Sequence, residues 1–150
     1  LLRNAAPNID LLAVFSVQEE IGWRGAGVAA YTLAPDMAIA LDFTPALDLP
    51  ALNGEENTRY NARIGCGPAI YTADRSTLSD PRLVRWLVES AEANGLPYQM
   101  RQPGGGGTDA GAIHKTRGGI PSVSLYTPGR EYARCTAAPA AVVPSVNVHS

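Results

Sequence analysis

The chain has 150 residues, a formal net charge of −2, 45% apolar residues and 17% charged residues. This composition is typical of one globular domain with a core, and the absence of a long basic run argues against nucleic-acid binding by phosphate neutralisation. No apolar stretch approaches the roughly 20 residues that span a bilayer. Cys66 and Cys135 have no metal-like spacing, so a reducing cytosol is the default location, with a single disulfide as the alternative.

The first part of the chain predicts a strand, a helix and a second strand. The continuous apolar run 10–17 predicts a buried strand, the Ala-rich run 26–33 a short helix, and residues 37–44 a second buried strand. Short connections in this order favour a parallel pair of strands in an α/β sheet. Residues 45–63 have no periodicity and are predicted as a loop.

The second part predicts further strands around one long helix. Asp80 and Pro81 predict the N-cap and first turn of a helix over 82–94, which Gly95 ends. A glycine loop then leads to a short helix that ends near His114. Further strands are predicted at 69–71, 96–101 and 122–126. We therefore predict an α/β fold over residues 1–130, with a mixed, largely parallel sheet flanked by helices, and an atypical tail at 131–150.

Acidic residues follow both early strands. Glu19 and Glu20 close the first apolar run, and Asp42 closes the second. A buried, unpaired carboxylate is costly, so such groups usually hold a cation or a proton. One carboxylate can bind a metal while its neighbour takes a proton from the water that the metal activates. The pattern predicts a metal-dependent hydrolase, with solvated strand ends or helix N-caps as the alternative.

Other chemistries have weaker support in the sequence. The loop 104–107 lacks the Gly-Lys-Ser/Thr ending of a phosphate-binding loop, so it favours a close backbone approach to a substrate or a sheet end. Ser16 and Ser122 have no Gly-x-Ser-x-Gly context. Cys66, between two glycines, is predicted to be a small apolar filler rather than a reactive thiol. His114 is predicted to be structural.

Several stretches together resemble one family. They are VQEEIGWRGA at 17–26, ALDFT with DLP within 40–50, GCGPAI at 65–70, and GTDAGAIH with GIPS within 107–122. In this order, over about residues 8–130, they resemble the di-metal aminopeptidases grouped as glutamyl, deblocking and tetrahedral aminopeptidases. Many members of that family carry the name cellulase or endoglucanase. The match would make this chain the C-terminal part of the catalytic domain.

The resemblance implies a cytosolic exopeptidase with a pair of zinc or cobalt ions, an α/β domain and a tendency to form large homo-oligomers. It implies that Glu19 is the general base, Glu20 a ligand of one metal and Asp42 a ligand of the other. The substrate side of the site would be lined by Gly107, Thr108 and Asp109.

The chain departs from the family pattern at both ends. The family's first metal-binding His and its bridging Asp have no match in residues 1–17, so we expect them in a missing upstream part. A further metal-binding His should follow Arg130, but residues 131–134 read Glu-Tyr-Ala-Arg. Deleting one base after the Arg130 codon would give Arg-Asn-Met-His, so we hypothesise a frameshift that also accounts for the tail. His149 lies too far along to be this ligand.

These observations predict a metal-dependent aminopeptidase that removes N-terminal residues from peptides, with this fragment inactive alone. A glycoside hydrolase is one alternative, because two carboxylates suffice for that chemistry, but the aromatic content of 7% is low for a sugar cleft. A non-catalytic remnant or assembly subunit is another. The preferred N-terminal residue and the metal stay open, since oxygen and nitrogen ligands serve zinc, cobalt and manganese alike.

Overall fold

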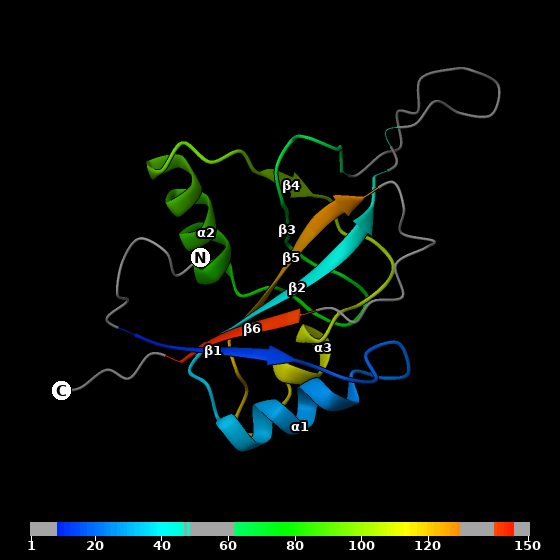
Figure 1. Cartoon of the computed structure of the whole chain (residues 1–150), viewed down its shortest axis with the longest axis vertical. Coiled ribbons are helices and arrows are strands. Elements are labelled where there is room, and N and C mark those ends of the chain that lie inside the picture. Colours follow the sequence, from blue (N-terminus) through cyan, green and yellow to red (C-terminus); the bar gives the residue numbers. More distant parts are fainter. Residues whose placement is uncertain (1–8, 47, 49–61, 130–139, 146–150) are drawn as a thin grey trace.

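The computed structural model describes residues 9–46, 48, 62–129 and 140–145, and it is built around one six-stranded sheet with helices on both faces (Figure 1). The strand order is β1-β6-β2-β5-β3-β4. The strands are β1 (Asp10–Phe15), β2 (Ala38–Pro45), β3 (Ala69–Tyr71), β4 (Gln99–Arg101), β5 (Ser122–Gly129) and β6 (Ala140–Ser145). The helices are α1 (Arg24–Leu33), α2 (Pro81–Ala93) and α3 (Ala110–Ile113). The predicted α/β fold is confirmed.

The sheet mixes parallel and antiparallel pairs. Strand β2 pairs in parallel with β5, and β3 pairs in parallel with β4, whereas β3 and β5 are antiparallel. Strand β6 is antiparallel to both β1 and β2 and lies between them. The prediction of an adjacent β1–β2 pair is therefore wrong, although the two strands run in the same direction. Because α1 connects β1 to β2, the two strands run in the same direction, but they need not be neighbours in the sheet.

The two faces of the sheet have separate cores. On one face, small residues let α1 and α3 pack closely against β2, and this core consists of Ala26, Ala30, Ala38, Ile113 and Ile120. On the other face, α2 covers β3 and β5 through Ile70, Leu83 and Val123. Alternate residues of a strand point to opposite faces, so Ala38, Ala40 and Asp42 belong to the face of α1 and α3.

Three predicted strands differ from the structure in their surroundings or length. Strand β4 covers only Gln99–Arg101 of the predicted range 96–101. Strand β1 lies at the sheet edge and Phe15 is 79% exposed, so the prediction of a buried strand is wrong here. A continuous apolar run cannot by itself distinguish a central strand from an edge strand. Strand β5 reaches Gly129, beyond the predicted end at 126, because its whole length pairs with β2.

The ends of α2 follow the predicted local chemistry. The carboxylate of Asp80 accepts a hydrogen bond of 2.8 Å from the backbone N–H of Arg82, and Pro81 is the first helical residue. Gly95, with φ of +61°, follows the helix in the left-handed conformation that favours glycine. No helix in the described part of the chain is both long and apolar enough to cross a membrane.

Candidate functional site

The turn between β1 and α1 carries Glu19 and Glu20. The pair lies beyond the end of β1, which stops at Phe15. The carbonyl of Glu19 accepts hydrogen bonds from the backbone N–H groups of Gly22 (3.1 Å) and Trp23 (2.9 Å), which closes the turn. A Cβ at Gly25 would lie 2.6 Å from the backbone of Val17, so glycine is needed where α1 begins. The turn holds Glu19 half-buried and Glu20 exposed.

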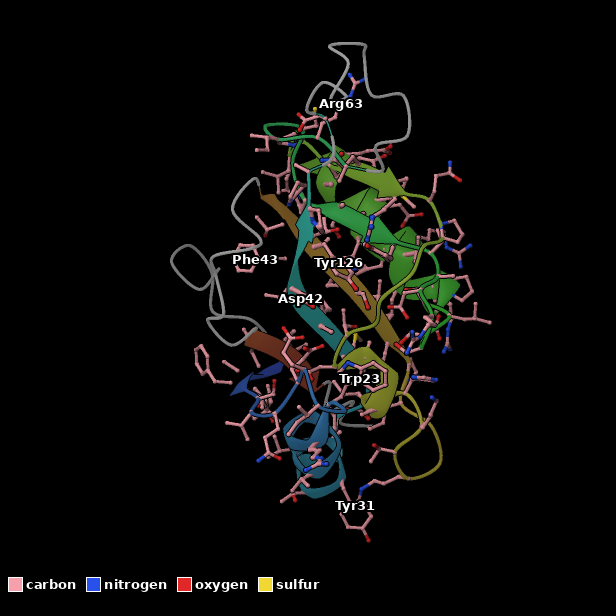
Figure 2. The ribbon with its side chains drawn as sticks, turned by 90° about the vertical axis from the view of Figure 1, so that its right-hand side faces the viewer. Trp23, Tyr31, Asp42, Phe43, Arg63 and Tyr126 are labelled. Atoms are coloured by element: carbon pink, nitrogen blue, oxygen red, sulfur yellow. The ribbon has the colours of Figure 1, made fainter. Side chains whose placement is uncertain are left out.

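Asp42 reaches the same region from β2. It pairs in register with Tyr126 of β5, and its carboxylate accepts a 2.6 Å hydrogen bond from the backbone N–H of Phe43. Figure 2 shows Asp42 and Tyr126 next to each other in the middle of the sheet, with Trp23 near α3. Because alternate residues of a strand point to opposite faces, Asp42 lies on the sheet face that carries α1 and α3.

These carboxylates lie within electrostatic reach of one another. Burial, followed by the charges of Asp42, Glu20 and Asp109, raises the pKa of Glu19 to about 7. Burial raises the pKa of Asp42 to about 6, with Asp109 and Glu20 adding to the effect against a backbone hydrogen bond that lowers it. Among the described residues, no Lys, Arg or His forms an ion pair with this acidic group. The group is therefore an uncompensated concentration of negative charge.

Asp109 is the most buried member of the group, with 3% of its surface exposed. One of its oxygens accepts a short hydrogen bond from the hydroxyl of Ser16, 93 residues away in the sequence. The other, Oδ1, is buried without a hydrogen-bond partner among the described residues. Burial raises the pKa of Asp109. The Ser16–Asp109 pair fixes the end of β1 against the start of α3.

Thr108 ties the glycine loop to the sheet. Its hydroxyl lies 2.8 Å from the hydroxyl of Ser124 in β5 and accepts a 3.2 Å hydrogen bond from the backbone N–H of Ala110. The side chain of Thr108 thus caps the start of α3, while the side chain of Asp109 makes no capping bond. Thr108 is 1% exposed, and Gly107 is half-buried.

Trp23 is a site residue that the sequence analysis missed. Its indole Nε1–H donates a 2.9 Å hydrogen bond to Oε1 of Glu19 and lowers the pKa of that carboxyl against the larger effect of burial. Its ring packs on two glycines, since a Cβ at Gly107 would lie 2.6 Å from Trp23 Cζ2 and one at Gly111 3.3 Å from Cζ3. Two features of the sequence could have indicated this packing. Trp23 follows Glu19 by four residues, and Gly107 and Gly111 are also four residues apart.

Gly111→Ala is expected to reduce the free energy of unfolding by about 1–2 kcal/mol, because overpacking of this size has that typical cost. The new Cβ would lie 2.5 Å from the hydroxyl oxygen of Ser76 as well as close to Trp23. Urea denaturation followed by circular dichroism measures the effect.

Gly27→Ala in α1 is the matched control for Gly111→Ala. Its new Cβ would meet only the Cβ of Ala112, at 3.6 Å. The control should stabilise the chain by about 0.5–1 kcal/mol, because alanine favours a helix interior. Equal effects of the two variants would contradict the close packing of Trp23 on Gly111.

The other candidates from the sequence have simpler roles. Nδ1 of His114 lies 2.7 Å from the carbonyl oxygen of Ala110, which agrees with a structural role at the end of α3. Ser122 donates to the carbonyl of Ile120. Cys66 is exposed as a free thiol, so the prediction of a buried apolar filler is wrong. Its flanking glycines, Gly65 and Gly67, have positive φ and form a surface turn.

The acidic group fits a divalent cation in chemistry but supplies too few ligands for a closed site. Carboxylate oxygens suit zinc, cobalt and manganese, and their mutual repulsion favours a cation among them. Within the residues that the structure describes, however, no three His, Cys, Asp or Glu side chains form a group that could hold a metal ion. The described residues therefore do not by themselves supply a ligand set for a metal ion.

Comparison with known proteins identifies the family. Residues 1–136 match the family described as M42 glutamyl aminopeptidase. A putative aminopeptidase from Acetivibrio thermocellus is 44% identical over 121 residues, covering 81% of this chain and 35% of that protein.

Two solved structures extend the comparison to the fold. The aminopeptidase APDkam598 from the archaeon Desulfurococcus kamchatkensis is 34% identical with a TM-score of 0.71, over 86% of this chain and 35% of that one. The TET1 peptidase of Pyrococcus horikoshii, described as assembling into a tetrahedron or a large octahedral shell, is 27% identical with a TM-score of 0.59, over 87% of this chain and 34% of that one. The chain spans about a third of the length of these proteins, and it belongs to the M42 glutamyl aminopeptidase family.

Proposed function

We propose that these residues form part of the catalytic domain of a metal-dependent aminopeptidase that removes N-terminal residues from peptides. The observation that carries the proposal is the electrostatic coupling of Glu19, Glu20 and Asp42, with raised pKa values at Glu19 and Asp42 and no cationic partner among the described residues. Membership of the M42 family gives this acidic group its reaction class.

Glu20 and Asp42 would hold the metal ions, and Glu19 would act as the general base. A divalent ion at such a site lowers the pKa of water, which makes a nucleophile available at neutral pH. Glu19 is suited to take the proton, because burial and its acidic neighbours raise its affinity for a proton. Trp23 holds one oxygen of this carboxylate, which leaves the other free for the reaction.

The loop 107–109 would border the substrate side of the site. Thr108 and Asp109 are almost fully buried, so we assign them the task of holding the loop in place through Ser124 and Ser16. Gly107, half-buried beside Trp23, would then offer its backbone to the peptide. This assignment refines the predicted substrate-binding role of the three residues.

Residues 1–130 would be the C-terminal portion of the catalytic domain, and the 150 residues alone would show no measurable peptidase activity. The described residues lack a complete ligand set for even one metal ion. Changes to the residues that surround metal ligands lower metal affinity or activity by about 10–100-fold, and we expect the loss of the ligands themselves to lower them further. We propose that the parent protein is cytoplasmic. We propose also that it is a homo-oligomer, by analogy with the TET1 peptidase and its large assemblies.

The frameshift after Arg130 remains part of this proposal. Residues 130–139 lie outside the described part, while 140–145 form β6. Resequencing the gene tests it directly. An intact reading frame with no extra base after the Arg130 codon would refute the frameshift and leave the rest of the proposal in place.

A chimera tests the function. Residues 9–129 would replace the matching segment of the aminopeptidase from D. kamchatkensis, which supplies the rest of the fold. The purified chimera is expected to release p-nitroaniline from aminoacyl p-nitroanilides, to lose this activity with a chelator and to regain it with zinc or cobalt. Hydrolysis that a chelator leaves unchanged would contradict the metal-dependent function, and cleavage of a glycoside instead would favour a glycosidase.

A further inference from the structure

The turn 73–78, between β3 and α2, is built around one aspartate. The Oδ1 atom of Asp74 accepts three hydrogen bonds: from the backbone N–H of Ser76 (2.7 Å), from the hydroxyl of Ser76 (2.8 Å) and from the backbone N–H of Thr77 (2.8 Å). The backbone N–H of Asp74 in turn donates a 2.9 Å hydrogen bond to the carbonyl of Thr77. An aspartate that accepts from the backbone just ahead of it stabilises a turn. Asp74 therefore sets both the backbone and the hydroxyl orientation of Ser76.

The hydroxyl of Ser76 packs on the same two glycines as the indole of Trp23. A Cβ at Gly107 would lie 2.6 Å from Ser76 Oγ and 2.6 Å from Trp23 Cζ2. A Cβ at Gly111 would lie 2.5 Å from Ser76 Oγ and 3.3 Å from Trp23 Cζ3. Because both side chains approach the same point on each glycine, Ser76 and Trp23 lie next to each other. A displacement of the Ser76 hydroxyl would therefore leave one side of the indole without support.

Trp23 connects this packing to Glu19. Its indole Nε1–H donates a 2.9 Å hydrogen bond to Oε1 of Glu19. The turn that carries Glu19 is strained, because Gln18 (φ +59°) and Trp23 (φ +54°) have the left-handed backbone conformation. That conformation costs free energy for residues other than glycine and persists only where the surrounding structure holds it. The orientation of the Glu19 carboxylate therefore depends on contacts outside its own turn, and the packing of Trp23 against Ser76 is one of them.

We propose that Asp74 is a positioning residue for the general base. It fixes the hydroxyl of Ser76, which supports the indole of Trp23, and the indole holds one oxygen of Glu19. The proposal rests on the aminopeptidase function, because Glu19 is the base only in that reaction. Asp74 acts through other residues and contributes no group to the chemistry. Its loss should therefore disturb the geometry of Glu19 and leave every reacting group in place.

Hydrogen exchange of the Trp23 indole measures this link in the 150-residue chain itself. The chain has two tryptophans, so Trp86→Phe identifies the Trp23 Nε1–H signal in ¹H–¹⁵N spectra. Asp74→Ala removes the acceptor of three hydrogen bonds in the turn. We expect the Trp23 Nε1–H to exchange with solvent about tenfold faster in this variant, which is the size of change that weakening one hydrogen bond allows. Asp74→Asn keeps an oxygen at the Oδ1 position and should preserve the slow exchange.

Two further variants separate this link from a general loss of stability. Asp80→Ala is the matched control, because Asp80 also accepts a 2.8 Å hydrogen bond from the backbone two residues ahead, but at the start of α2 on the other face of the sheet. It should leave the exchange of the Trp23 indole unchanged. Ser76→Ala removes only the hydroxyl and keeps both backbone hydrogen bonds to Asp74. It should speed the exchange by a smaller factor, and it decides the question if Asp74→Ala does not fold.

Kinetics of the chimera show whether the link reaches the base. Asp74→Ala is expected to lower kcat by about 10–100-fold, because a small displacement of a catalytic group has an effect of this size. The KM value should stay within about threefold, since the groups that bind the peptide are unchanged. A loss confined to KM would assign the turn to substrate binding and overturn the proposal. Unchanged indole exchange in Asp74→Ala or, if that variant does not fold, in Ser76→Ala would also overturn it, as would equal effects of Asp80→Ala or of Asp74→Asn.

Failure of this proposal and failure of the proposed function give different results. Indole exchange is measured on the chain without substrate, metal or turnover. An inactive chimera, together with the expected exchange in Asp74→Ala, would refute the proposed function alone. Conversely, an active chimera whose kcat is the same with and without Asp74→Ala would refute the positioning role of Asp74 alone.

Discussion

Glu19→Gln in the chimera is expected to lower kcat by a factor of about 10²–10⁴, the range that general acid–base catalysis contributes. Glutamine has nearly the same shape as glutamate, and its amide oxygen can still accept the hydrogen bond from Trp23. The change therefore removes the basic group while preserving the turn. Steady-state kinetics on aminoacyl p-nitroanilides, with metal content determined for each protein, measure the effect.

Two further variants make this result specific. Glu89→Gln changes an exposed glutamate on α2 and should leave kcat unchanged. Glu20→Gln should instead reduce the bound metal, because we assign Glu20 as a ligand. An active Glu19→Gln enzyme, with kcat within a factor of about three of the parent, would exclude Glu19 as the base, since such a loss lies far below the range for general-base catalysis.

The metal-free chain is expected to become less stable as the pH rises from about 5 to about 8. Glu19 and Asp42 have folded-state pKa values raised to about 7 and about 6 from ordinary values of 4.5 and 3.8. The folded state therefore binds more protons than the unfolded chain between these values, and this contribution to stability is lost as pH rises through them. After solvent screening of these partly exposed carboxyls, the expected loss is about 2 kcal/mol.

Urea titrations in the presence of a chelator test this pH dependence. Glu19→Gln should flatten the curve and raise stability at the higher pH, whereas Glu89→Gln should leave it unchanged. Zinc added at the higher pH should recover stability, because an ion that binds the folded state stabilises it by mass action. A wild-type chain whose stability rises over the same pH range would show that these carboxylates are already neutralised by a cationic partner.

The parts of the fold that depend on local chemistry could be predicted from the sequence. The start of α2 follows from Asp80 and Pro81, whose capping and backbone preferences act within one helical turn. The position of β6 between β1 and β2 could not be predicted, because strand order results from competition between segments far apart in the chain. The exposure of Phe15 has the same origin, since it depends on β1 being an edge strand.

Some residues of the candidate site could likewise be predicted from the sequence, whereas their contacts could not. Glu19, Glu20 and Asp42 could be proposed from the acids after two apolar runs and from the family resemblance. The contacts around them could not, since the Ser16–Asp109 hydrogen bond joins residues 93 apart. Trp23 was also missed, because its indole comes to lie beside Gly111 only after the chain has folded. Periodicity identifies which residues are buried but not which of them meet.

The central claim is that the two consecutive glutamates have different tasks, with Glu20 and Asp42 binding metal and Glu19 free to act as a base. Anomalous diffraction from crystals of the zinc-loaded chimera tests it most directly. We expect zinc peaks about 2.0–2.2 Å from carboxylate oxygens of Glu20 and Asp42, the usual zinc–oxygen distance, with Glu19 uncoordinated and still bonded to Trp23. Peaks remote from both residues, or a zinc ion bound by Glu19 while Glu20 points into solvent, would contradict the account.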